Sequence, residues 1–278
     1  MTTFLDQVIA ERRADAAAAR RRDPSLGRSL RDAPAPRPFA LALERAAAPG
    51  RLAVIAEVKR ISPATGALAH PGFDPGAQAL LYAGAGAAAI SILTEPRHWG
   101  GSFDDLRAIR GIVKVPLLCK DVVVDEYQVW QARAAGADAV LLIAEALGDP
   151  ELSRLVDLVC DLGMEPFVEA HDPTAFGRAV KTRARVVGAN ARDLRDPSVI
   201  DRSRARMLHT FVRPGQLFVA ESGIASASDL AELPARVDAV LVGSALMTAA
   251  HPAALVRELA QAKRPSAPGS VPLQDIVR

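Results

Sequence analysis

The sequence contains few lysines and cysteines, and each shortage limits what the protein can be. Only five of its 34 basic residues are lysines, at positions 59, 114, 120, 181 and 263. Arginine carries the other positive charges, so a lysine at the end of a strand indicates a need for a compact, titratable ammonium group. The two cysteines, Cys119 and Cys160, are too few for a disulfide scaffold and lie in apolar runs. We therefore expect buried thiols in a cytoplasmic protein.

Excess charge and long apolar runs are missing as well. The 34 basic and 32 acidic residues leave a net charge of +2, which gives no general attraction for nucleic acid or an anionic membrane. No apolar run has the length of a membrane-spanning helix. The histidines, at positions 70, 98, 171, 209 and 251, have no spacing typical of metal ligands, so we predict no metal site. Nothing in the sequence indicates an oligomeric state.

What the sequence does contain is a repeated pattern of apolar runs. The chain has 278 residues, half of them hydrophobic, which is enough for one large domain. Eight runs read as strands, at 52–56, 87–93, 115–119, 139–143, 166–168, 185–188, 217–220 and 239–242. Amphipathic helical segments separate them, for example at 75–83, 103–109, 126–135, 150–161 and 173–180. Eight strand-helix units close most simply into a (β/α)8 TIM barrel.

Two further segments flank this predicted barrel. Near the N-terminus, Thr3 and Asp6 can form a capping box, so we predict a folded helix over about residues 3–20 rather than a targeting sequence. A second short helix is expected at 39–46. We assign residues 1–50 to an N-terminal helical extension and 51–263 to the barrel domain. Residues 264–278, which are rich in Ser, Gly and Pro, are assigned to a flexible C-terminal tail.

The end of the first predicted strand carries two opposite charges. Glu57 and Lys59 are two residues apart, so in extended backbone they project to the same side. The following Ser62, Pro63 and Gly66 predict a loop. A structural ion pair would explain Glu57 and Lys59 if they stood alone, but other strand ends repeat the arrangement.

Polar residues follow the other apolar runs, at the end of the barrel where active sites lie. They are Thr94, Glu95, Lys120, Asp121, Glu169, His171, Asn190, Arg192, Glu221, Ser222, Gly223, Gly243 and Ser244. So many polar groups at one mouth would be costly to bury without a ligand. The sequence therefore predicts an active site built from these strand ends.

The last two strand ends indicate the chemical class of the ligand. Ser222-Gly223 and Gly243-Ser244 are small residues whose backbone N–H groups can point into the mouth, and Ser226 or Ser244 can begin a short helix there. Exposed amides and helix N-termini favour an anion, which is how this fold usually binds phosphate. We expect a small phosphorylated substrate, with the lysines and glutamates left for acid-base chemistry.

Several motifs, taken in order, resemble one known family. They are IAEVKRISP at 55–63, GGSFDDL at 100–106, Lys120-Asp121 followed by Tyr127-Gln128, GADAVLL at 136–142, GANARDL at 188–194, ESGI at 221–224 and LVGS at 241–244. Together they resemble the indole-3-glycerol-phosphate synthase family from the N-terminal helix to the final strand. The resemblance implies a (β/α)8 barrel whose N-terminal extension packs near the mouth.

The resemblance also implies a cofactor-free lyase of tryptophan biosynthesis. Its reaction converts 1-(2-carboxyphenylamino)-1-deoxyribulose 5-phosphate to indole-3-glycerol phosphate, with release of carbon dioxide and water. By resemblance, Lys120 is the general acid supported by Glu57, Lys59 holds the substrate carboxylate or shares the acid role, and Glu169 is the base. Asn190, Glu221 and Ser222 complete the implied catalytic set. The implied substrate-binding residues are Ser62, Trp99, Val122, Arg192 and Leu194, and the implied phosphate-binding residues are Gly223, Gly243 and Ser244.

Three positions depart from the family pattern. Val122 and Trp99 stand where the family usually has Phe, and Ala191 replaces a frequent second Asn. The first two line the aromatic end of the site in the family, so a specialised relative acting on a ring-substituted anthranilate analogue is an alternative. A phosphoribosylanthranilate-isomerase-like barrel is disfavoured, because it should carry Cys where Glu57-Val58-Lys59 stands. A non-catalytic phosphate-binding barrel should lack Lys59, Lys120 or Glu169, and all three are present.

Overall fold

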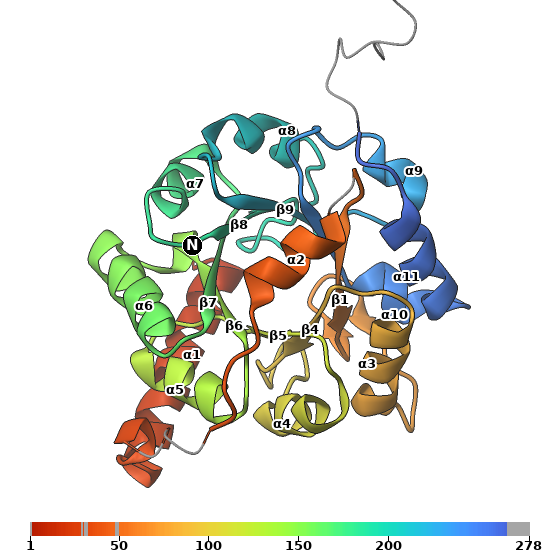
Figure 1. Ribbon diagram of the computed structural model, residues 1–278. Helices are drawn as coiled ribbons and strands as arrows, with labels where there is room; N and C mark the ends of the chain where they lie inside the picture. The colour runs from red at the N-terminus through yellow and green to blue at the C-terminus, as the bar shows by residue number, and fades with distance from the viewer. Residues whose placement is uncertain (1, 29, 31–32, 48–49, 266–278) are drawn as a thin grey trace, which may run out of the picture.

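Eight parallel strands close into a barrel, with helices around the outside (Figure 1). The computed structural model describes residues 2–28, 30, 33–47 and 50–265, so the expected tail lies outside the described residues from position 266 onwards. The barrel strands are β1 (Ala53–Val58), β4 (Ala89–Leu93), β5 (Leu117–Lys120), β6 (Ala139–Ile143), β7 (Glu165–Ala170), β8 (Val186–Asn190), β9 (Leu217–Glu221) and β10 (Ala239–Val242). β1 closes the ring by pairing with both β4 and β10. The predicted (β/α)8 barrel is confirmed.

Helices follow the strands as the amphipathic segments predict. They are α3 (Pro75–Gly84), α4 (Phe103–Ile112), α5 (Glu126–Ala134), α6 (Asp149–Asp161), α7 (Pro173–Ala179), α8 (Arg204–Leu208), α9 (Ala227–Leu230), α10 (Ser244–Thr248) and α11 (Pro252–Gln261). Short 3-10 turns lie at η1 (Leu26–Arg28), η3 (Ala144–Ala146) and η4 (His209–Phe211). Side-chain oxygens of Asp74, Ser102, Asp125 and Asp172 accept backbone N–H groups at helix starts, which satisfies donors that have no partner within the helix. None of the described helices is both long and apolar enough to cross a membrane.

The segment after β1 differs from the prediction. Instead of a plain loop, β2 (Ile61–Ser62) and β3 (Gly66–Ala67) form a small antiparallel hairpin in which Ser62 lies opposite Gly66. Gly66 has a φ of 81°, a conformation that turns the chain back easily only in glycine. The apolar-run criterion missed this hairpin because each of its strands is only two residues long.

The barrel strands also extend beyond the apolar runs. Glu57 pairs with Ser91, and Asn190 pairs with Glu221, inside the regular ladder. The polar residues that we expected to follow the strands therefore include several that form their last positions. Backbone pairing in a parallel sheet does not depend on the polarity of the side chain, so the strand continues to the rim of the mouth.

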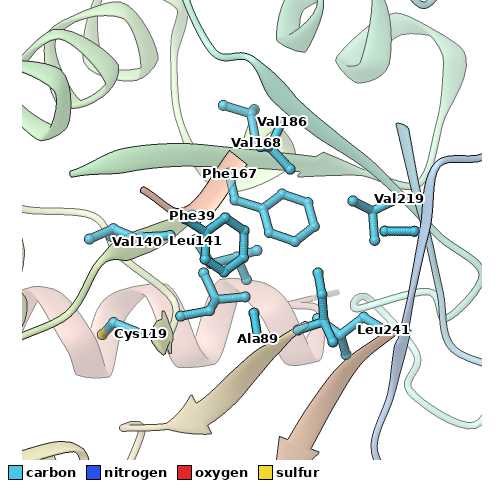
Figure 2. Packing of buried hydrophobic residues seen from close by; sticks show 14 of the residues in the cluster. Phe39, Ala89, Cys119, Val140, Leu141, Phe167, Val168, Val186, Val219 and Leu241 are labelled. Carbon is cyan, nitrogen blue, oxygen red and sulfur yellow. The ribbon is translucent and has the colours of Figure 1, made fainter. Parts of the chain in front are cut away.

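Large apolar side chains fill the barrel below the mouth. Phe167 from β7 and Phe39 from α2 (Phe39–Ala47) are almost fully buried, and Figure 2 shows them among Val219, Leu241 and Ala89. In Figure 1, α2 lies across the opening of the barrel that faces the viewer. The backbone N–H of Arg37 bonds to Asp138, which directly precedes β6, so α2 covers the end where the strands begin.

The other N-terminal helix, α1 (Phe4–Arg22), lies at the opposite end of the barrel. Its predicted capping box between Thr3 and Asp6 is present. The guanidinium of Arg12 forms two hydrogen bonds of 2.8 Å with Asp121, which follows β5. The N-terminal segment therefore covers both ends of the barrel, whereas the resemblance implied only the mouth.

Candidate active site

Every residue to which the family resemblance assigned a role lines one pocket at the carboxyl ends of the strands. The pocket has an empty volume of about 890 Å³, including the part open to solvent. We call it the mouth pocket, and its lining includes Glu57, Lys59, Ser62, Trp99, Lys120, Val122, Glu169, Asn190, Arg192, Leu194, Glu221, Ser222, Gly223, Gly243 and Ser244. Two strand-end residues singled out in the sequence, Thr94 and His171, do not line it.

Lys120 occupies the centre of the charged part of the mouth pocket. Its Nζ atom lies 3.1 Å from Glu169 and 2.8 Å from Glu221, which end or nearly end β7 and β9. The Lys120 side chain is only 14% exposed, and the two carboxylates are almost fully buried. Three different strands thus bring one ammonium and two carboxylates into contact, which no local sequence spacing could do.

Burial and neighbouring charge change the proton affinities of this group. Burial raises the pKa of Glu221 well above that of an ordinary glutamate, and repulsion from Glu169 raises it further. Burial lowers the pKa of Lys120, but attraction to Glu169 and Glu221 outweighs that effect and leaves the pKa above its ordinary value. The site therefore holds a protonated lysine in contact with two buried carboxyl groups.

A second acid-base pair lies at the end of β1. The Nζ atom of Lys59 is 2.7 Å from Glu57, whose carboxylate is buried. Burial raises the pKa of Glu57, but attraction to Lys59 and Lys120 outweighs it, so the pKa is below the ordinary value. Gly243 makes room for this pair, because a Cβ atom there would lie 2.3 Å from Glu57 and 3.1 Å from the Lys59 Nζ atom.

Asn190 connects the charged groups to the neighbouring turns. Its side-chain nitrogen donates to Glu169 at 3.4 Å, and its side-chain oxygen accepts from the Ser222 hydroxyl and the Arg192 backbone, both at 2.9 Å. Ser222 has a φ of 68°, an uncommon conformation for a residue other than glycine. The Arg192 guanidinium donates to the carbonyl of Pro197. These bonds hold the polar side of the mouth pocket in one arrangement.

The mouth pocket has two chemically different sides. The turns Ser222-Gly223 and Gly243-Ser244, which we call the phosphate turns, lie after β9 and β10, and Ser226 and Ser244 begin short helices as predicted. An apolar wall is formed by Trp99 after β4, Val122 after β5, and Leu141 and Ile143 within β6. In the strand order around the barrel, β9 is opposite β5 and β10 is opposite β6. The small-residue turns and the apolar wall therefore lie on opposite sides of the mouth pocket.

Residues of α1 pack against the lining of the mouth pocket, and no pattern in the sequence identified which residues make these contacts. Arg12 is 5% exposed and pairs with Asp121, whose second donor is the Thr94 hydroxyl at 2.7 Å. Burial raises the pKa of Asp121, and attraction to Arg12 offsets only part of that increase. The Phe4 ring meets the Trp99 ring edge-on, with centroids 5.8 Å apart. These contacts join segments about a hundred residues apart, which explains why spacing did not reveal them.

His171 belongs to a separate buried cluster. Its Nδ1 atom lies 3.1 Å from Glu145, and its Nε2 atom lies 3.3 Å from Asp193. Burial raises the pKa of Glu145 to about 7 and lowers the pKa of His171. Glu145, His171 and Asp172 lie close enough to hold a metal ion, although Glu145 and Asp172 already accept backbone N–H groups. The histidine spacing did not anticipate this cluster, because its members come from different strand ends.

Comparison with known sequences gives one consistent family. The sequence profile named indole-3-glycerol phosphate synthase matches residues 5–259. A protein of that name from Parafrankia sp. (strain EAN1pec) is 47% identical over 262 residues, covering 93% of this chain and 95% of the relative. Another, from Beutenbergia cavernae, is 49% identical over 76% of this chain and 78% of its own length.

Comparison with solved structures agrees on the fold. A chain of tryptophan synthase from M. tuberculosis superposes with a TM-score of 0.61 at 17% identity, covering 84% of this chain and all of that chain. The 3-hexulose-6-phosphate synthase of Salmonella typhimurium gives a TM-score of 0.58 at 17% identity, covering 76% and 98%. At these identities the likeness concerns the barrel alone.

Proposed function

Because this chain belongs to the indole-3-glycerol phosphate synthase family, we propose that its mouth pocket closes the indole ring with the residues described above. The protein is a carboxy-lyase that acts on 1-(2-carboxyphenylamino)-1-deoxyribulose 5-phosphate. It forms indole-3-glycerol phosphate and releases carbon dioxide and water. The roles of individual residues are our proposal.

Condensation comes first, and Lys120 serves as its acid. The ring carbon that bears the carboxylate attacks the ribulose carbonyl, and a carbon-carbon bond forms as the carbonyl oxygen takes a proton. An alkoxide is a much stronger base than an amine, so the Lys120 ammonium can donate even with a raised pKa. Loss of carbon dioxide then returns the electron pair to the ring and leaves a hydroxylated five-membered ring. Glu57 supports the site electrostatically.

Dehydration completes the indole, and Glu169 serves as its base. The hydroxyl formed in the first stage leaves as water after receiving a proton, for which Lys59 is the second candidate acid. Glu169 takes the proton from the ring carbon next to nitrogen, which creates the second double bond. Glu169 lies 3.1 Å from the Lys120 Nζ atom. The proton that Glu169 gains is therefore close to Lys120, which must be reprotonated before the next turnover. Glu221, which also contacts Lys120, is the second carboxyl group beside this proton transfer.

The two sides of the mouth pocket orient the substrate. We assign the phosphate to Gly223, Gly243 and Ser244, where backbone N–H groups favour an anion. The aromatic ring then lies against Trp99 and Val122 on the opposite side. We assign the substrate carboxylate to Lys59 and Arg192, and the adjoining wall to Ser62 and Leu194, all of which line the pocket. The carboxylate must be held until condensation is complete, because its loss supplies the electrons that restore the ring.

One observation carries the proposal: Lys120 contacts Glu169 and Glu221 between the phosphate turns and the apolar wall. The test is to mix the purified protein with the carboxyphenylamino substrate and to follow indole absorbance together with carbon dioxide. Indole and carbon dioxide are expected in equal amounts. Phosphoribosylanthranilate is the control substrate, and its isomerisation without any indole formation from the first substrate would contradict the proposal.

We further propose that the substrate is small and that the protein works in the cytoplasm without nucleic acid. The net charge of +2 provides no electrostatic footprint for nucleic acid. Cys119 and Cys160 are both free thiols, as expected in a reducing compartment. Fractionation of cells with an antibody to this chain tests the location, and recovery outside the cytoplasmic fraction would contradict it.

A further inference from the structure

Glu95 is a fully buried carboxylate in the lining of the mouth pocket, and the proposed reaction does not use it. It is 0% exposed and lies two residues after β4. One oxygen accepts the backbone N–H of Arg97 at 3.0 Å, and the other accepts those of His98 at 2.6 Å and Trp99 at 3.1 Å. A buried carboxylate needs strong donors, and here three consecutive backbone amides supply them.

These bonds shape the loop that carries Trp99. The backbone carbonyl of Glu95 accepts the N–H of Gly101 at 2.7 Å, so the loop closes on both the side chain and the main chain of Glu95. The close return requires glycine, because a Cβ atom on Gly101 would lie 2.3 Å from the Leu93 carbonyl oxygen. The carbonyl of Trp99 in turn accepts the N–H of Ile61 at 3.2 Å. Glu95 is thus the centre of a closed loop attached to the neighbouring hairpin.

Trp99 is the part of this loop that faces the proposed ring site. It lines the mouth pocket, packs against the hydrophobic core and meets the Phe4 ring edge-on. Glu95 also lines the pocket, but its two oxygens are occupied by the loop amides. Glu95 therefore has no oxygen free to bind a ligand, and the part of its loop that offers a ring a surface is the indole of Trp99.

We propose that Glu95 is a positioning residue that fixes Trp99 as the wall of the ring site and so sets how tightly the aromatic part of the substrate is held. This inference rests on the proposed function for the identity of the ring. A carboxylate suits the role because both of its oxygens accept. Glutamine keeps the shape but presents an NH2 group to at least one backbone N–H, so two donors would face each other. Glu95→Gln is therefore expected to release the loop without removing side-chain volume.

The chain contains a matched control at an equivalent place in another repeat. Glu145 lies two residues after β6, is largely buried, and accepts the backbone N–H groups of His171 at 2.7 Å and Asp172 at 3.2 Å. It does not line the mouth pocket. Both bonds go to one oxygen of Glu145, whereas the Glu95 bonds use both oxygens, so Glu145→Gln can keep a carbonyl oxygen on its two amides. It is therefore the control for a Glu-to-Gln change at a buried strand end that leaves the backbone contact in place and does not involve Trp99.

Ligand binding without turnover separates a positioning role from a structural one. Anthranilate and inorganic phosphate serve as probes of the two sides of the pocket. For Glu95→Gln we expect the Kd of anthranilate to rise at least about fivefold, while that of phosphate stays within about twofold. For Glu145→Gln both values should stay within about twofold. Equal weakening of both ligands in Glu95→Gln, or unchanged anthranilate binding, would overturn the proposal.

A spectroscopic readout tests the intermediate step. Trp99 and Trp130 are the only tryptophans, and Trp130 lies on α5 outside the mouth pocket, so Trp130→Phe leaves Trp99 as the reporter. In that background, Glu95→Gln should shift the Trp99 emission to longer wavelength and increase its quenching by iodide, whereas Glu145→Gln should not. An unchanged Trp99 spectrum in Glu95→Gln would contradict the proposal even if activity were lost.

The wild-type protein provides a measurement that does not depend on a variant folding. If Glu95 holds the loop, the amides of Arg97, His98 and Trp99 should exchange hydrogen slowly, at rates like those of the adjacent strand. Exchange at the rate of an open loop would overturn the proposal. Failure of the proposed function would appear differently, as absence of indole formation with these amides still protected.

Discussion

The Lys120 Nζ atom lies 2.8 Å from a carboxylate oxygen of Glu221, whose pKa is raised well above the ordinary value by burial and by the nearby Glu169. The pair joins the last residue of β5 to the last residue of β9, which are opposite strands of the barrel. Removing charge from water at the centre of the mouth costs free energy, and the ammonium offsets that cost for both carboxylates. The same arrangement keeps a proton donor and a proton acceptor in contact.

Replacing Lys120 with alanine should lower kcat by at least about 100-fold, because a positioned general acid typically contributes that much. Substrate binding should remain measurable, since the proposed phosphate turns lie on other strands. Indole absorbance at saturating substrate gives the rate, and calorimetry gives the binding. Lys114→Ala is the control, because Lys114 is exposed. Near-normal turnover in Lys120→Ala would show that another group donates the proton.

Replacing Glu169 with glutamine should stop the reaction after condensation. The amide keeps the shape of the side chain but cannot accept the proton that must leave as the indole forms. Rapid quenching should then show carbon dioxide released without a matching amount of indole. Glu165→Gln, at the other end of β7, is the matched control and should form both products normally. Equal amounts of indole and carbon dioxide from Glu169→Gln at the normal rate would rule out this base.

Inorganic phosphate should compete with the substrate at the phosphate turns. Backbone N–H groups at small-residue turns and at helix N-termini favour an anion, which is how this fold usually binds phosphate. Gly243→Ala should weaken this inhibition, because the added Cβ would lie 2.3 Å from the Glu57 carboxylate and 3.1 Å from the Lys59 Nζ atom. Steady-state inhibition kinetics measure both effects. A crystal grown in sulfate with no anion at the turns, together with no inhibition by phosphate, would contradict the assignment.

The ring side of the mouth pocket should discriminate only modestly between substituted substrates. Val122 is 2% exposed beside the pocket, and a methyl-sized mismatch in an apolar site is worth about 1 to 3 kcal/mol. We therefore expect unsubstituted and small methyl, hydroxy or halo analogues all to react. The discrimination is measured by comparing kcat/KM for the unsubstituted substrate and for each analogue.

The variant Val122→Phe tests whether this position sets ring choice. The larger side chain should favour the unsubstituted substrate over the substituted ones by about tenfold or more relative to the parent protein. Val122→Ala, which makes the side chain at this position smaller instead of larger, is the control. A parent protein that already prefers the unsubstituted substrate by about tenfold would refute specialisation for a substituted ring.

Removing Arg12 should destabilise the protein strongly. Its side chain and that of Asp121 are 6% and 1% exposed, so Arg12→Leu leaves a buried carboxylate without its cation. Loss of one partner of a buried pair typically lowers the free energy of unfolding by about 3 to 5 kcal/mol. Urea denaturation of Arg12→Leu measures the loss, and Asp121→Asn added to Arg12→Leu should recover part of it.

The control for this experiment is Arg13→Leu. Arg13 is 53% exposed and pairs with Glu151 at the surface, so its loss should change the unfolding free energy by less than about 1 kcal/mol. If Arg12→Leu and Arg13→Leu had the same small effect, the Arg12–Asp121 pair would not be what attaches α1 to the mouth.

The sequence by itself determined the barrel and the composition of its mouth. Apolar runs alternating with amphipathic segments allow few other ways to bury both faces of eight short strands. Because parallel strands end at one edge, polar residues at those ends were expected to gather there, and Glu57, Lys120 and Glu169 do line one pocket, although His171 does not. The capping box at Thr3 and the short helices at the phosphate turns are local features, so they too could be predicted.

Only the tertiary structure decided which of these groups touch and what lies around them. Lys120 contacts Glu221 because β5 and β9 face each other across the closed ring. The order of the strands along the chain does not say which side chains are close enough to touch. The attachment of α1 through Arg12, and the buried Glu95 that holds the loop of Trp99, depend on contacts without sequence periodicity. The pKa values of the buried groups also depend on the tertiary structure. Each pKa responds to desolvation and to the distance from nearby charges, and neither can be read from the order of residues.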